Sequence, residues 1–255
     1  MSPSLETMQA GDSAFEVKFP LQPDLALEVR HWARANLLAD PHGSGEFGDE
    51  YDVSSLYMDT ADLDVFLGSR AVGRSKYRIR RYNSADSVFL ERKSKNKSVV
   101  CKWRTPIPIV ELDHLHSQTP DPNWPGNWYL EHLIESRLHP VCEIRYHRTA
   151  RIGKSSSGTI RLTMDTQIRA LPQNTLGFHS TAAAPIRLGK APVILELKYA
   201  KEMPVLFKQL VQKFRLQPRL ASKYKLAVLE LDLAAGLVPE AVLRTRSEQL
   251  ACSSS

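Results

Sequence analysis

Polar and apolar residues alternate along three consecutive segments between positions 74 and 104. Side chains of a β-strand point alternately to its two faces, so residues two positions apart share a face. One face of these segments would carry the charged residues Arg74, Lys76, Arg78, Arg80, Glu91, Lys93, Lys102 and Arg104. The other face would carry Tyr77, Ile79, Leu90, Cys101 and Trp103. The polar breaks at 83–86 and 94–98 suit hairpin turns, so the pattern predicts three antiparallel strands with a cationic face.

The same alternation predicts strands elsewhere in the chain, over 15–19, 51–58, 141–148, 159–165, 167–171 and 193–199. Apolar residues at helical spacing predict helices over 24–38, 61–67, 128–138, 205–214 and 221–233, and Asp59 and Thr60 would cap the second of them. Prolines interrupt 106–125, where we expect no regular element, and 172–190 is expected to be the longest loop. About eight strands, mostly antiparallel, with several helices indicate an α+β fold.

Length and composition set the domain organisation. The chain has 255 residues, of which 42% are hydrophobic, enough to bury a full core. We expect a disordered tail over 1–13, one domain over 14–235 and a polar tail over 236–255. No window approaches the ~18 apolar residues of a membrane helix, and the N-terminus lacks the features of a signal peptide. Three scattered cysteines fit a reducing compartment, so we expect a cytoplasmic protein.

The charged strand faces share one motif, Glu-x-Lys, at Glu16/Lys18, Glu91/Lys93 and Glu196/Lys198. If the sheet closes on itself, these faces meet in one lumen, and closure also removes exposed edges. Desolvating many cations without counter-charge is too costly, which favours a bound oligophosphate. Arginine binds phosphate oxygens in a bidentate manner, and a carboxylate among these cations could hold Mg²⁺ or Mn²⁺.

Other interpretations of the charged residues remain open at this point. Each Glu-x-Lys could be a solvated cross-strand pair, worth ~0.2–1 kcal/mol. The formal charge of +6 only weakly favours anionic partners. The His114-x-His116 pair has no third ligand nearby, which argues against a metal site there. No glycine-rich phosphate loop, nucleophile elbow or His-Glu-x-x-His motif is present.

Eight short motifs follow one another in the order seen in a known family. They are Phe15-Glu-Val-Lys-Phe19, Ser55-Leu-Tyr-Met-Asp-Thr60, Tyr77-Arg-Ile-Arg80, Leu90-Glu-Arg-Lys93, Tyr146-His-Arg-Thr-Ala150, Arg161-Leu-Thr-Met-Asp165, Leu195-Glu-Leu-Lys198 and Ser222-Lys-Tyr224. The chain resembles, over about residues 14 to 230, the VTC domain, the polyphosphate polymerase domain of the vacuolar transporter chaperone complex. That family is similar to the CYTH domains and triphosphate tunnel metalloenzymes. The resemblance implies a closed antiparallel β-barrel, a tunnel, of about eight strands with helices outside.

The resemblance also implies roles for the matching residues. The residues that would grip the phosphate chain are Lys18, Arg78, Arg80, Lys93, Arg148, Arg161, Lys198 and Lys223. Glu196 resembles the ligand of Mn²⁺ or Mg²⁺, and Glu91 and Glu16 could assist it. Strand alternation rather than a motif adds Lys102 and Arg104 to Arg78, Arg80 and Lys93 as residues that would bind the phosphates of ATP.

Two departures from the related patterns affect the expected function. Hydrolytic CYTH relatives begin with Glu-x-Glu-x-Lys, whereas Ala14 stands at the first of those positions here. The loss of that carboxylate favours the polymerase branch over triphosphate hydrolysis. The chain also shows neither the phosphate-sensing SPX domain nor the membrane segment of the eukaryotic complex.

We therefore expect a polyphosphate polymerase with ATP and inorganic polyphosphate or triphosphate as its partners. A hydrolase acting on tripolyphosphate or a nucleoside triphosphate in the same lumen is the first alternative. A polyphosphate-binding module without catalysis is the second. An RNA-binding surface is less favoured, because Tyr77 and Trp103 fall on the face opposite the cations.

Overall fold

The structure, a computed structural model, describes residues 15–69, 72, 75–96, 99–178, 184–189, 193–219, 222–243 and 245. Its internal contacts divide the described chain into two compact units. The first unit takes residues from 54–144 and 170–185, and the second from 15–53, 145–169 and 186–245. The single domain over 14–235 stays a prediction, and the tail over 1–13 lies outside the described residues.

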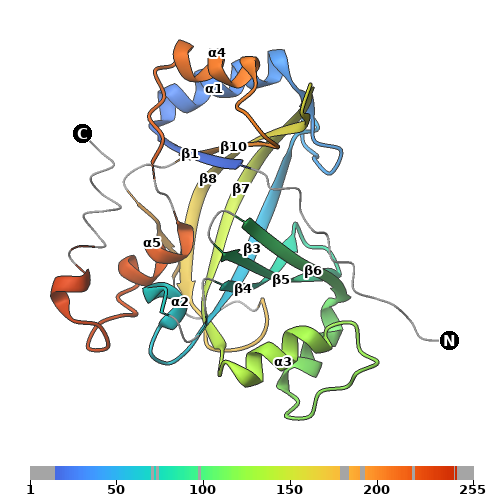
Figure 1. Ribbon diagram of the computed structural model, residues 1–255, viewed down its shortest axis with the longest axis vertical. Helices are drawn as coiled ribbons and strands as arrows, with labels where there is room; N and C mark the ends of the chain where they lie inside the picture. Colours follow the sequence, from blue (N-terminus) through green and yellow to red (C-terminus); the bar gives the residue numbers. More distant parts are fainter. Residues whose placement is uncertain are drawn as a thin grey trace. The chain divides into compact units, whose positions relative to one another are not determined.

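The first unit is built around a meander of neighbouring strands (Figure 1). Its elements are most of β3 (Glu50–Asp59), α2 (Asp64–Leu67), β4 (Ser75–Tyr82), β5 (Ser87–Asn96), β6 (Val99–Pro108), the 3-10 helix η1 (Ile109–His116) and α3 (Asn127–Glu135). The N-cap position of α2 is Leu63, but side chains before it satisfy the first turn: Asp59 accepts hydrogen bonds from the backbone N–H groups of Val65 and Phe66, and Thr60 Oγ1 accepts one from that of Asp64. The capping role expected of Asp59 and Thr60 is therefore confirmed, although the helix begins later than predicted.

The second unit combines long strands with helices. Its elements are β1 (Phe15–Leu21), α1 (Pro23–Asn36), β2 (Leu38–Ala39), most of β7 (His139–Ser155) and β8 (Gly158–Pro172), β9 (Ile186–Arg187), β10 (Val193–Tyr199), α4 (Val205–Lys213) and α5 (Lys223–Glu230). Pro23 at the first helical position suits its missing N–H group and begins α1. No described helix has both the length and the apolar character that crossing a membrane requires.

The described strands follow the hydrogen-bonded order β1-β10-β8-β7-β3-β4-β5-β6, with β2 beside β7 and β9 beside β8. Five pairs of strands are antiparallel: β1–β10, β10–β8, β2–β7, β4–β5 and β5–β6. The antiparallel α+β fold is thus confirmed. β1 and β6 stand at the two ends of the order among the described strands, so the closed barrel is not confirmed.

The hydrophobic core of the second unit lies against one face of its sheet. Helices α1 and α4 lie along the same side of β1 and β10 in Figure 1. Val29 of α1 and Phe207 of α4 are fully buried and belong to one cluster with Phe19, Leu162 and Leu195 of the strands. Since strand residues alternate, the charged residues at even positions of β1 and β10 lie on the opposite face.

Two predicted elements differ from the structure. Residues 109–116, expected to be irregular, form η1. The segments 159–165 and 167–171, expected to be separate, are parts of the single strand β8. Gln167 adopts a φ of 50°, which is uncommon for a non-glycine residue and interrupts the alternation that the sequence shows at this point. Residues 156–157 form the turn between β7 and β8, with Gly158 at a φ of 120° where β8 begins.

Candidate functional site

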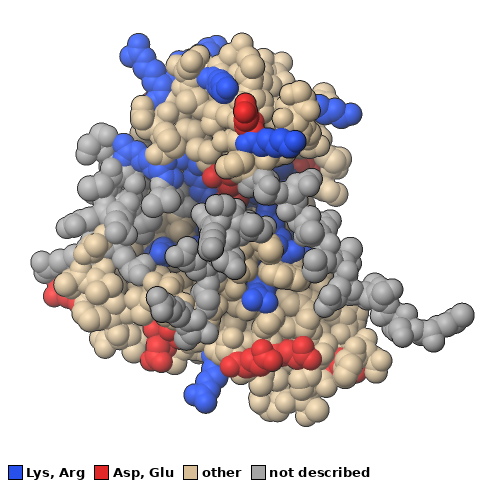
Figure 2. All heavy atoms as spheres, in the orientation of Figure 1, with Lys and Arg blue, Asp and Glu red and all other residues tan. Residues whose placement is uncertain are grey.

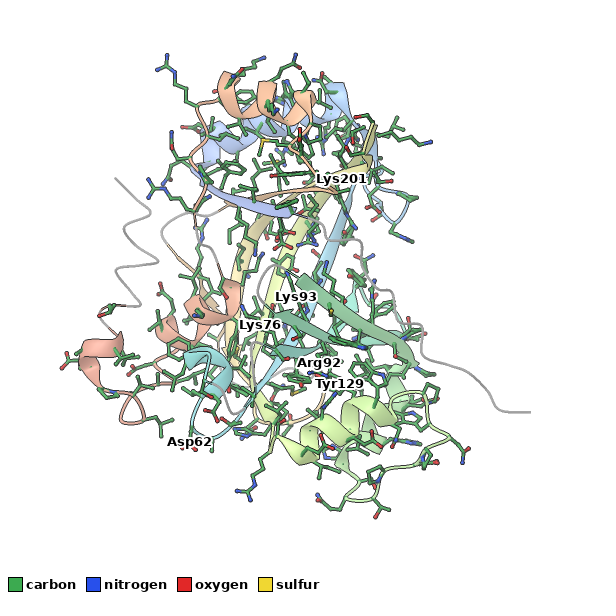
Figure 3. All side chains as sticks on the ribbon, viewed as in Figure 1. Asp62, Lys76, Arg92, Lys93, Tyr129 and Lys201 are labelled. Carbon is green, nitrogen blue, oxygen red and sulfur yellow. The ribbon has the colours of Figure 1, made fainter. Side chains whose placement is uncertain are left out.

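The first unit carries three rows of residues across β4, β5 and β6. Register places Lys76 opposite Lys93, and Lys93 opposite Lys102. The next two rows read Arg78–Glu91–Arg104 and Arg80–Phe89–Pro106. Figure 3 shows Lys76 and Lys93 on neighbouring strands. Like charges directly opposite one another destabilise a sheet, so the lysine row indicates a surface adapted to an anion.

Glu91 lies among the arginines of the middle row. Its Oε2 accepts a hydrogen bond of 2.6 Å from Nε of Arg78, and its Oε1 is 3.3 Å from Nε of Arg104. Nε of Arg80 is 3.9 Å from Oε2 and donates to Ser55 Oγ. Burial raises the pKa of Glu91, but the three guanidinium groups lower it more, to about 2. Glu91 is therefore ionised and serves as the counter-ion of the arginines.

The opposite face of these strands contacts α3, as expected for a core face. Tyr77 is buried, and its ring lies 6.1 Å from that of Tyr129, which Figure 3 labels beside α3. The apolar face predicted from the sequence also holds a cation. Arg92 lies over the rings of Tyr77 and Trp103 and contacts Nε2 of His132. Because strand residues alternate, Arg92 lies on the face opposite Glu91 and Lys93 and is not part of the basic face.

In the second unit, a four-residue square of alternating charge lies across β1 and β10. Lys18 is opposite Glu196, and Glu16 is opposite Lys198. Lys198 Nζ is 2.8 Å from Glu196 and 3.7 Å from Glu16, while Lys18 Nζ is 3.1 Å from Glu16 and 3.5 Å from Glu196. Each carboxylate therefore contacts both lysines, as the shared face of two Glu-x-Lys motifs on antiparallel strands requires.

Glu196 is the buried member of this square, with 8% of its side chain exposed. Burial raises its pKa, but Lys198, Lys18, Arg148 and Lys223 together hold it well below its ordinary value. The carboxylate is consequently ionised at neutral pH in a cationic environment. That is the protonation state a metal ligand needs.

Arg148 and Lys223 converge on a second buried carboxylate. Arg148 donates from Nε and Nη2 to Asp165 at 2.6 and 2.8 Å, and Lys223 of α5 donates to the same carboxylate. The side chain of Asp165 is fully buried. Burial raises its pKa, but Arg148 and Lys223 lower it to about 2. The C-terminal helix is thus joined to β7 and β8 through charge.

Arg161 completes the second-unit residues predicted to bind phosphate. It lies opposite Lys198 on β8, and its Nη2 contacts Asp40 Oδ2 at 2.8 Å and Tyr51 Oη at 2.9 Å. From the sequence we expected these cations to need an external counter-charge. The structure corrects this, because carboxylates of the chain contact the cations of both units at close range.

Not all basic side chains belong to these clusters. On the surface formed by α1 and α4, Figure 2 shows lysines and arginines at separate places, with an acidic side chain beside one of them. In the rows of β4–β6 and the square of β1–β10, by contrast, strand pairing places the charged residues next to one another. Among the predicted residues, Ala14 and Arg74 lie outside the described part of the chain.

The oxygens available for a divalent cation are Glu16, Glu196 and a hydroxyl. Thr163 lies opposite Glu196 on β8, is 1% exposed, and its Oγ1 has no hydrogen-bond partner within the described residues. No group of three or more His, Cys, Asp or Glu side chains in the described ranges could hold a metal by itself. These donors fit Mg²⁺ or Mn²⁺ held by one or two carboxylates with phosphate oxygens and water, which is the usual arrangement for Mg²⁺.

The contacts of Glu91 favour its role as a counter-ion over that of a metal ligand, because arginine Nε groups approach both of its oxygens. No role was predicted from the sequence for Asp165, Asp40 or Thr163. Alternation along β8 could have placed Thr163 and Asp165 on the face of Arg161, but nothing in the sequence could have paired Asp40 with Arg161.

Comparison with known proteins identifies the family. The sequence profile described as the VTC domain matches residues 13–231. The chain belongs to the VTC domain family. This confirms the resemblance drawn from the eight motifs. No curated protein matches the sequence of this VTC domain protein.

A solved structure shares the fold of this VTC domain protein. A candidate adenylate cyclase from Bacillus halodurans is 14% identical with a TM-score of 0.52, and the match covers 81% of this chain and 92% of that one. A Hippeastrum protein described as a candidate adenylyl cyclase with a dominant triphosphatase activity is 13% identical with a TM-score of 0.48, covering 88% and 97%. At such identities the likeness concerns the fold alone.

Proposed function

We propose that this VTC domain protein is a metal-dependent phosphotransferase that adds the terminal phosphoryl group of ATP to a growing polyphosphate chain. The observation that carries the proposal is the lysine row of Lys76, Lys93 and Lys102, next to the row of Arg78, Glu91 and Arg104. Cations two residues apart along β4 and along β6 match the repeating negative charge of a phosphate chain. Membership of the VTC domain family supports the same function.

Arg78 and Arg80 would bind and orient the phosphates. Glu91 contacts Arg78 and Arg104 through their Nε atoms, which fixes the plane of each guanidinium group. Planar, fixed donors suit phosphate oxygens, and the transfer of a phosphoryl group depends mainly on positioning and on neutralising charge. No covalent intermediate with the protein is required.

The second unit carries further positive charge and candidate metal ligands of its own. Lys18, Lys198 and Arg148 are held by buried or half-buried carboxylates, and Lys223 joins them from α5. Glu196 and Glu16 would hold Mn²⁺ or Mg²⁺, which when bound would neutralise charge on the phosphate oxygens. The lysines that contact these carboxylates would exchange them for phosphate oxygens as substrate and metal bind together.

A gel assay tests the proposed function directly. The protein is incubated with ATP and Mn²⁺, the products are separated on a polyacrylamide gel stained for polyphosphate, and ADP and free phosphate are measured in parallel. We expect a ladder of chains and ADP in amounts that match the phosphate incorporated. Free phosphate without a ladder would instead identify a triphosphate hydrolase. Neither product, with tripolyphosphate still raising the melting temperature, would identify a binding module.

Replacing Thr163 by Val tests the metal and phosphate site without disturbing the fold. The hydroxyl is buried without a partner within the described residues, so its removal should leave the free energy of unfolding unchanged or raise it. If the hydroxyl contacts a charged ligand, turnover should fall about tenfold. Turnover and denaturant unfolding measure the two effects separately.

The matched control is Thr105→Val. Thr105 accepts a hydrogen bond of 2.9 Å from Trp128 Nε1 on the face opposite the cations. The control should lower stability by about 1 kcal/mol and leave turnover unchanged. Unchanged turnover in the Thr163 variant would remove the hydroxyl from the site.

A further inference from the structure

Two aromatic side chains lie at one end of the basic face of the first unit. Phe89 stands in the row Arg80–Phe89–Pro106, and Tyr82 follows two residues after Arg80 on β4, so strand alternation places both rings on the face of the cations. Both side chains are half-buried. Aromatic rings offer neither positive charge nor N–H donors to a phosphate group. The binding of a polyphosphate chain therefore does not explain why two rings lie at this end of the face.

Arg104 lies over the ring of Phe89 and near that of Tyr82. Its Cζ atom is 3.6 Å from the centre of the Phe89 ring and 5.4 Å from that of Tyr82. The two rings contact each other edge to face, with centres 5.6 Å apart. Glu91 Oε1 holds Nε of Arg104 at 3.3 Å, and 38% of the Arg104 side chain is exposed. Phe89 and Glu91 thus hold the guanidinium group of Arg104 in place while part of its side chain stays exposed.

A fixed guanidinium plane on an aromatic ring is a surface on which nucleobases stack. Along the strands, the aromatic row is two rows from Lys76, Lys93 and Lys102, which corresponds to about 13 Å. In the intervening row, Arg78 is the arginine that remains for the phosphates when Arg104 binds the base. The order of the rows therefore matches the order of groups in a nucleoside triphosphate, from its base to its terminal phosphate.

We infer that Arg104, supported by Phe89 and Tyr82, binds the base of a nucleoside triphosphate and directs its terminal phosphate toward the lysine row. The inference rests on the proposed function in taking the donor to be a nucleotide. It assigns a direction to the donor along β4–β6. It also predicts that a nucleotide and inorganic polyphosphate bind differently, because only the nucleotide has a base that contacts the aromatic end of the face.

Phe89→Leu tests this role, because leucine keeps an apolar side chain at the position but removes the ring that supports Arg104. Calorimetric titration in the presence of Mg²⁺ at fixed salt should show ATP binding weakened about tenfold and tripolyphosphate binding unchanged. The matched control is Phe47→Leu in the second unit, where Arg34 lies 3.8 Å from the ring centre but is tied to Asp49 and Glu50. That control should change neither affinity.

A measurement on the unaltered protein keeps the inference testable if the variant folds poorly. ATP and GTP should bind several-fold more tightly than CTP and UTP, because purines offer more area for stacking, and Phe89→Leu should remove the difference. Equal affinities for the four nucleotides would overturn the inference. So would equal losses of ATP and tripolyphosphate binding in the variant, or a wild-type protein that binds tripolyphosphate and no ATP.

The outcome is separable from that of the proposed function. If ATP binding depends on Phe89 but no polyphosphate ladder forms, the base site is supported and the polymerase function is contradicted. If a polyphosphate ladder forms but the affinity for ATP does not depend on Phe89, the proposed function is supported and the base site is contradicted.

Discussion

Glu196→Gln is expected to lower metal-dependent turnover by about a hundredfold or more while leaving the protein folded. Glu196 is the most buried carboxylate of the square on β1 and β10, and its lowered pKa keeps it ionised. Glutamine preserves the size of the side chain but removes the charge that a divalent cation requires. Lys18 and Lys198 retain their contacts with Glu16, so the variant leaves neither lysine without a carboxylate.

The dependence of turnover on metal concentration shows which role Glu196 has. If Glu196 is a metal ligand, raising Mn²⁺ should restore part of the activity of the variant, because the remaining ligands bind the ion more weakly. If Glu196 only positions the lysines, added Mn²⁺ should have no effect. The matched control is Glu50→Gln, since Glu50 contacts Arg34 and His147 rather than the lysines, and should leave turnover unchanged. Full activity of Glu196→Gln at every Mn²⁺ concentration would remove it from the mechanism.

Period-two alternation was sufficient to predict which residues share a face. β10 was predicted with its observed bounds, and the charged faces of β1, β5 and β10 follow directly from the parity of their residues. Parity does not determine register. That Lys76, Lys93 and Lys102 form one row depends on the geometry of two turns, and a shift by two residues would have paired lysine with glutamate.

Long-range partners were the other part that the sequence could not supply. Asp40 contacts Arg161 from a loop far away in the chain, and Arg104 contacts Phe89 across a hairpin whose register was unknown. In β8, the left-handed backbone at Gln167 made one strand look like two. The closed barrel came from the resemblance rather than from the residues, and it is the part of the fold that the strand order does not confirm.

Asp165→Asn is expected to destabilise the protein by about 3–5 kcal/mol at neutral pH. The carboxylate is fully buried, and the side chains of Arg148 and Lys223 that contact it are 9% and 10% exposed. Asparagine keeps the shape but leaves two buried cations without their counter-charge. Urea unfolding should show a lower midpoint with an unchanged slope. The control Asp62→Asn changes an exposed carboxylate, labelled in Figure 3, and should shift stability by less than about 0.5 kcal/mol.

The pH dependence and a double variant show that charge causes this loss. Because the folded pKa of Asp165 is about 2 and its ordinary value is 3.8, its contribution is complete above pH 4 and disappears as the pH falls toward 2. The stability difference between wild type and Asp165→Asn should therefore shrink over that range. Adding Lys223→Met to Asp165→Asn removes one of the uncompensated cations, so the double variant should be more stable than the sum of the two single changes predicts. Strict additivity, or a difference that is constant with pH, would mean that Asp165 acts through packing and not as the shared counter-ion of Arg148 and Lys223.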